Sequence, residues 1–121
     1  MRSHTPKILA PAGDKTTFLA AVAAGADAIY CGLKLFSARM EAANFSIEEL
    51  SRLARLARSR QIQVHIAFNT LIKESETEKA FRLLSKLNQY VMFDALIVQD
   101  PAVVSLARQA GITQDLHLST L

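Results

Sequence analysis

Short apolar runs alternate with amphipathic helical patterns along this 121-residue chain, and that alternation constrains the fold more than any other feature. Five of the runs have the length and composition of buried strands. They are Lys7–Ala10, Ala28–Cys31, Gln63–Phe68, Ala95–Val98 and Leu116–Ser119. Strands separated by helices usually pair in parallel, with the helices packed against the sheet. The sequence therefore predicts an α/β fold of four βα units and a fifth parallel strand, in a single domain spanning residues 1–121.

The alternation of side chains within the third run indicates what kind of sheet this is. Val64, Ile66 and Phe68 share one face of that strand, and His65 lies on the other, because successive residues point to opposite sides. The bulky face should meet the helices, and the same parity places Cys31 toward them. A second face with polar residues favours a barrel interior. We therefore predict a TIM-barrel-like (β/α) half-barrel, and the alternative is a five-stranded flavodoxin-like sheet serving as a small-ligand module.

Helix boundaries carry their own signals. Ser46 and Glu49 fit a capping box, and so do Ser75 and Glu78. Asp100 stands before a proline, which predicts an N-cap followed by the first helical residue. Helix ends are predicted at Gly25 and Gly111.

Composition excludes several classes of protein. The single cysteine, Cys31, rules out an internal disulfide and cannot by itself hold a zinc ion or an iron–sulfur cluster. The net charge of +3 is mild, and Arg52, Arg55, Arg58 and Arg60 fit the solvated side of a helix better than a nucleic-acid stripe. The amino terminus lacks a signal-peptide pattern and no apolar run is long enough to span a bilayer, so we expect a cytoplasmic protein with no membrane partner.

Polar residues at or beyond the carboxyl ends of the predicted strands are the candidates for ligand binding, because parallel α/β proteins bind ligands at that edge. The residues assigned to a substrate pocket are Arg39, Asn44, Asn69, Gln99 and Ser119. Arg39 and Asn44 lie in the long loop after the second strand and could hold a carboxylate or phosphate. Asp100 also lies at this edge, but its expected role as an N-cap already accounts for it.

Other features are assigned structural roles. The loop of residues 10–14 could hold an anion on its backbone amides, but a tight turn with Asp14 as N-cap explains it better. His65 and His117 share the inward parity, and strand histidines are more often satisfied by core hydrogen bonds than used in catalysis. We assign no catalytic residue and no metal ligand.

Several blocks of the sequence together resemble the amino-terminal part of the U32 peptidase family. In order, these are residues 8–14 (ILAPAGD), 25–32 (GADAIYCG), 36–39 (FSAR), 44–46 (NFS), 68–71 (FNTL), 94–100 (DALIVQD) and 117–120 (HLST). Their order and spacing extend the resemblance over nearly the whole chain.

The resemblance implies a TIM barrel and a family labelled as collagenase-like peptidases. Some members act in pyrimidine hydroxylation of transfer and ribosomal RNA, with prephenate implicated, or in ubiquinone synthesis. The substrate is then a small molecule, an RNA or a peptide, bound through a full-length parent. Full-length relatives often carry a [4Fe-4S] cluster, whose cysteines are absent from this sequence.

Two expectations follow from the resemblance. One is that this chain is the amino-terminal half of a longer U32-type enzyme and is incomplete as a catalyst. The alternative is a non-catalytic half-barrel that acts as an assembly or binding subunit. A homodimer that closes the half-barrel is expected if the chain stands alone, since exposed sheet edges favour self-association.

Overall fold

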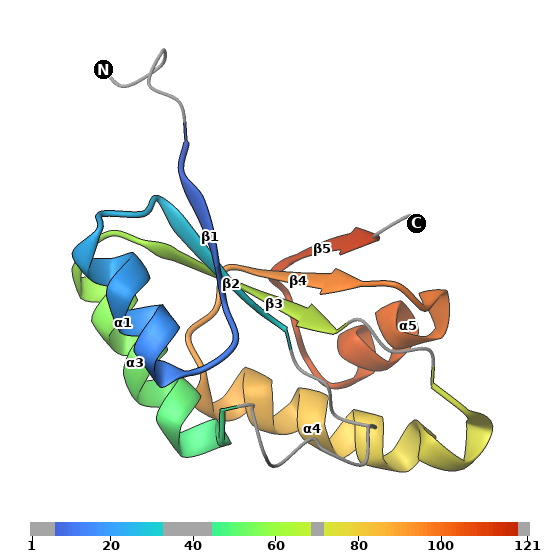
Figure 1. Cartoon of the computed structure of the whole chain (residues 1–121). Coiled ribbons are helices and arrows are strands. Elements are labelled where there is room, and N and C mark those ends of the chain that lie inside the picture. Colours follow the sequence, from blue (N-terminus) through green and yellow to red (C-terminus); the bar gives the residue numbers. More distant parts are fainter. Residues whose placement is uncertain (1–6, 33–44, 69–71, 119–121) are drawn as a thin grey trace.

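A computed structural model describes residues 7–32, 45–68 and 72–118 of the chain. It shows one five-stranded sheet whose strands alternate with helices (Figure 1). The strands are β1 (Leu9–Ala12), β2 (Ala28–Gly32), β3 (Gln63–Phe68), β4 (Ala95–Val98) and β5 (Asp115–Leu118). The helices are α1 (Lys15–Ala23), α3 (Ile47–Ser59), the 3₁₀ turn η1 (Glu74–Glu76), α4 (Thr77–Tyr90) and α5 (Pro101–Gln109).

The strand order is β1-β2-β3-β4-β5, and every neighbouring pair is parallel. Each strand therefore pairs with the strands next to it in the sequence, and the sheet remains open between β1 and β5. This order confirms the predicted half-barrel arrangement and contradicts the flavodoxin-like alternative, whose first two strands exchange places. Closure into a full barrel stays a prediction.

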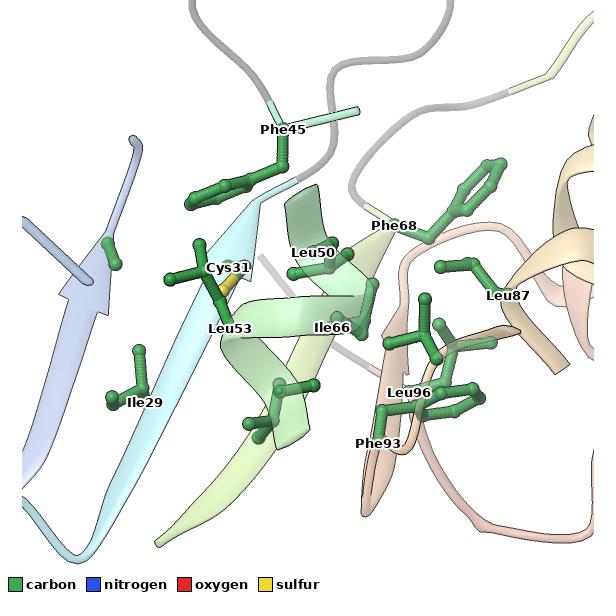
Figure 2. Close-up of a cluster of buried hydrophobic side chains, with 14 of the residues drawn as sticks. Ile29, Cys31, Phe45, Leu50, Leu53, Ile66, Phe68, Leu87, Phe93 and Leu96 are labelled. Carbon is green, nitrogen blue, oxygen red and sulfur yellow. The ribbon is translucent and has the colours of Figure 1, made fainter. Parts of the chain in front are cut away.

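The helices pack on one face of the sheet, and the core lies between the two layers (Figure 1). Ile29, Cys31 and Ile66 point into this layer and are fully buried, as the parity argument predicted for Cys31 and Ile66. Figure 2 shows these side chains interleaved with Leu50, Leu53 and Leu87 from α3 and α4. Among the described residues, no helix lies over the opposite face of the sheet, which carries Tyr30, 40% exposed.

The first strand differs from its prediction by two residues. It was expected at Lys7–Ala10 and instead covers Leu9–Ala12, so Pro11 lies inside it. Proline lacks an N–H and is tolerated in a sheet only where that group has no partner. Because β1 is an edge strand with β2 as its neighbour on one side, Pro11 fits there by turning its missing donor away from β2.

Ser46 and Asp100 are N-caps as predicted, whereas the predicted cap at Ser75 is wrong. The Ser46 hydroxyl accepts from the Glu49 N–H at 3.0 Å, which is one half of the predicted capping box, and the Asp100 carboxylate accepts from the Ala102 N–H at 2.9 Å. Ser75, however, is not a cap, because the turn η1 precedes α4 and Glu76 is the N-cap residue. The Glu76 carboxylate reaches back to the Lys73 N–H at 2.9 Å, which stabilises that extra turn.

Aspartates tie the beginnings of the strands together in pairs. The Asp27 carboxylate accepts from the Ile8 N–H at 2.7 Å, just before β1 and β2. The Asp94 carboxylate accepts from the Val64 N–H at 2.8 Å, at the start of β3 and β4. In both pairs the aspartate's own N–H donates back to the carbonyl of the same residue. The two strand pairs therefore repeat one local arrangement, which we call the aspartate clamp.

Within the described ranges, no helix has both the length and the apolar character required to cross a membrane.

Candidate functional site

The carboxyl ends of the five strands form one rim of the sheet, at Ala12, Gly32, Phe68, Val98 and Leu118. Of the predicted pocket residues, Gln99 lies at this rim, directly after β4, and its side chain is partly exposed. The other four predicted pocket residues lie outside the described residues; they are Arg39, Asn44, Asn69 and Ser119. The structure thus places one predicted pocket residue where a ligand of a parallel sheet would bind.

Asp100, next to Gln99, holds two segments of this rim together. One carboxylate oxygen accepts from the Ala102 N–H at 2.9 Å and caps α5. The other accepts from the Ile72 N–H at 3.1 Å, which belongs to the segment following β3. Both oxygens are therefore engaged by backbone donors, and Asp100 positions the rim around Gln99.

The loop after β1 is organised around Thr17. The Asp14 carboxylate accepts from the Thr17 N–H at 2.8 Å, and the Gly13 and Asp14 N–H groups both donate to the Thr17 hydroxyl at 3.2 Å. The hydrogen bond from the Thr17 backbone holds the pKa of Asp14 below its ordinary value. Since these amides already have an acceptor, the N-cap explanation of the loop holds and an anion site is not indicated.

Two histidines meet on the face of the sheet opposite the described helices. The ring centroids of His65 and His117 are 6.4 Å apart, with an interplanar angle of 78°. His65 Nε2 also lies 3.0 Å from Gln63 Oε1. Partial burial lowers the pKa of His65; the Asp94 carboxylate opposes this shift, whereas His117 and Lys7 act in the same direction as burial. His65 is the third residue of β3 and lies away from the rim, and within the described ranges no three metal-ligating side chains gather into a site.

Cys31 is a core residue. Its side chain is fully buried among the helices, and burial raises the pKa of its thiol to about 12. A neutral, inaccessible thiol cannot act as a nucleophile at physiological pH, which agrees with the parity prediction. The chain's single cysteine could supply at most one of the four thiolates of a [4Fe-4S] cluster, so its residues do not fit that cofactor.

Sequence reasoning missed two hollows away from the rim. A hollow of about 180 Å³ lies near the start of β1–β3, where Asp27, Gln61 and His65 contribute to its lining. A larger groove of about 590 Å³ lies between α3 and α4 on the outside of the helical layer. Arg52, from α3, was assigned to a solvated helix face, and Lys86 and Tyr90 of α4 were not considered with it. Only the packing of two helices against each other brings these side chains together.

Comparison with known proteins identifies a family and several relatives to which this chain is similar. The model of peptidase family U32 matches residues 13–121. An uncharacterized protease of Methanocaldococcus jannaschii is 36% identical over 106 residues, covering 88% of this chain and 26% of the relative. A collagenase of Porphyromonas gingivalis is 30% identical over 115 residues, covering 94% and 27% respectively.

The 23S rRNA 5-hydroxycytidine C2501 synthase of Escherichia coli is 36% identical over 104 residues, covering 86% of this chain and 16% of the relative. Proteins named for tRNA hydroxylation match as well. The chain spans about a quarter of the length of the first two relatives, and less of the rRNA synthase. Because the family model matches residues 13–121, which is most of the chain, the chain belongs to peptidase family U32.

Proposed function

We propose that this chain forms one side of the substrate pocket in a U32-type protein that hydroxylates RNA pyrimidines. The relatives named for 23S rRNA and tRNA hydroxylation support an RNA substrate. Gln99, which Asp100 positions at the rim, is the described residue that contacts the ligand in this proposal.

The state of Cys31 argues against this residue as the nucleophile of a cysteine peptidase. A cysteine peptidase needs an accessible thiolate beside a base, whereas this thiol is buried and its pKa is about 12. In the part of the chain that the structure describes, the hydrogen-bond partner of His65 is the Gln63 amide rather than a serine or threonine hydroxyl. Two relatives are named as a protease and a collagenase, but the described residues contain no nucleophile–base pair that would support peptide cleavage.

A segment exchange tests the proposal directly. The matching segment of the E. coli 23S rRNA synthase is replaced by this chain, and the chimera is expressed in E. coli lacking that synthase. Mass spectrometry of the nucleosides around C2501 should show restored 5-hydroxycytidine. Gln99→Ala in the chimera should lower that signal at least tenfold, whereas Gln89→Ala, on the exposed side of α4, should leave it unchanged.

The result also separates the alternative roles. A chimera that folds and hydroxylates equally well with Gln99→Ala would contradict the pocket assignment. A folded chimera without any hydroxylation that cleaves gelatin would favour a peptidase. The second candidate, an assembly subunit, is supported by the open edges of the sheet and by Leu9, which is 59% exposed. In that case the protein acts through its surface and not through its pocket, and Gln99→Ala leaves its function unchanged.

A further inference from the structure

Positive charge is concentrated on two neighbouring helices. Together with Arg60, which caps α3, the helices α3 and α4 carry seven of the 14 basic residues of the chain but three of its 11 acidic ones. The rest of the molecule is therefore close to neutral. A local excess of this kind attracts polyanions, even where the net charge of the whole chain is small.

The groove between these helices gathers the groups that a nucleic acid needs. It is lined by Ile47, Glu48, Ser51 and Arg52 from the beginning of α3, and by Lys86 and Tyr90 from the end of α4. Figure 1 shows how the end of α4 passes the beginning of α3 on the outside of the molecule. None of the six lining residues belongs to the strand ends that form the rim where Gln99 lies.

The two cations of the groove are available to a ligand. Arg82 pairs with Glu78 at 3.7 Å on the far turn of α4, but within the described residues neither Arg52 nor Lys86 forms an ion pair. Glu48, the acidic residue of the groove, lies in the first turn of α3, where the positive end of the helix dipole stabilises it. An arriving phosphate therefore need not displace a partner from Arg52 or Lys86.

Tyr90 gives the groove a feature that a purely ionic surface lacks. It is the last residue of α4, and its side chain is 54% exposed although it is large and aromatic. Exposed aromatic rings beside basic groups bind unpaired bases by stacking, while Arg and Lys follow the phosphate backbone. The Ser51 hydroxyl can donate a hydrogen bond to a ribose 2′-hydroxyl or accept one from it.

We infer that the groove between α3 and α4 binds a single-stranded segment of the RNA substrate, with Arg52 and Lys86 on phosphates and Tyr90 stacked on a base. The inference rests on the proposed function, because it is RNA that the named relatives modify. It adds a docking surface at a distance from the reacting nucleotide. Such a surface holds the RNA while the rim of the sheet contacts the base to be modified.

Fluorescence anisotropy with a 5′-labelled 15-nucleotide oligo(U) RNA tests this on the full 121-residue chain. Arg52→Gln/Lys86→Gln should weaken binding at least tenfold. If two phosphate contacts are lost, the slope of log K against log salt should also fall by about 1.4. Arg58→Gln/Arg60→Gln is the matched control, since it removes two exposed charges from the same region outside the groove. It should change binding less than threefold.

Tyr90→Leu measures the stacking contribution separately from charge. We expect about a tenfold loss of affinity with an unchanged salt slope, since leucine cannot stack on a base and the substitution removes no charge. All five substituted side chains are exposed, and circular dichroism spectra will show that the variants keep the fold.

Four outcomes would overturn the inference. Equal losses in the groove variant and its control would mean that net charge alone drives binding. Tight binding of poly-glutamate with the same loss in the groove variant would indicate an acidic protein as the partner. Absence of oligo(U) binding by the unmodified chain would remove the basis for the groove. The chimera gives an independent result, because hydroxylation that survives both groove substitutions would sink this inference and leave the proposed function standing.

Discussion

Three helices end in the same way, but one of them uses an unusual residue. Gly25 after α1 and Gly111 after α5 adopt positive φ angles of 77° and 91°. Gln61 occupies the equivalent place after α3 with a φ of 61°. In each case the positive-φ residue and the next one donate N–H groups to carbonyls in the last turn, which is the Schellman arrangement. Glycine adopts this conformation without steric cost, whereas glutamine does not.

Gln61→Gly should therefore stabilise the protein. We expect the free energy of unfolding to rise by about 0.5–1 kcal/mol, because the strain of a left-handed side chain is removed while both hydrogen bonds remain. Urea unfolding followed by circular dichroism measures this. Gln89→Gly in α4 is the control and should lower the stability by about 1 kcal/mol, as glycine does inside a helix. A loss of stability in both variants would contradict the assignment of strain to Gln61.

At the scale of secondary-structure elements, the aspartate clamp fixes how the strands begin. It supplies a carboxylate acceptor for a backbone N–H at the start of β3, where Val64 is 1% exposed. Water cannot easily replace that acceptor, so the clamp matters more than an exposed cap would. The same arrangement at Ile8 and Asp27 indicates that it is a device for holding neighbouring parallel strands in register.

Removing the clamp between β3 and β4 should be costly. Asp94→Ala leaves the buried Val64 N–H without its acceptor, and we expect a loss of about 1–3 kcal/mol in the free energy of unfolding. Amide hydrogen exchange of Val64, measured by NMR, should accelerate in parallel. Asp115→Ala, which removes an exposed carboxylate from β5, should change stability by less than about 0.5 kcal/mol. Unchanged exchange at Val64 would rule out the clamp as a stabilising contact.

Much of the secondary structure could be predicted from the sequence, and the wrong predictions have identifiable physical causes. The bounds of β3 and β4 were predicted to the residue, because each strand is an apolar run that lies between clear helix signals. The first strand was misplaced because Pro11 was taken as a loop residue, although an edge strand tolerates it. Gln99 could be placed at the rim from its position alone. The groove could not, because Arg52 and Lys86 meet only through the crossing of two helices.

At the scale of the whole molecule, the described helices cover the sheet on one side only. Its uncovered face presents Leu9, Tyr30 and the two histidines, and β1 and β5 leave two open edges. The edges are not equivalent, because Pro11 blunts β1 as a partner for another strand. The protein therefore combines a well-packed outer layer with an inner surface suited to association.

We expect the 121-residue chain to form a dimer that covers this face. Light scattering coupled to size exclusion should give about twice the monomer mass of 13.3 kDa. Leu9→Lys, on the uncovered face, should return the protein to a monomer, because a buried lysine would be desolvated at the interface. Leu19→Lys, on the outer surface of α1, should leave the dimer intact. A monomer at all concentrations for the unmodified chain would exclude this association.

The sequential strand order has a further consequence, which concerns how the molecule is made. Each strand docks beside the one synthesised just before it, so the sheet can extend one βα unit at a time as the polypeptide leaves the ribosome. No described strand has to wait for a partner encoded far downstream, and the entropy of closing long loops stays modest at every step. Folding during translation then follows the direction of the reading frame.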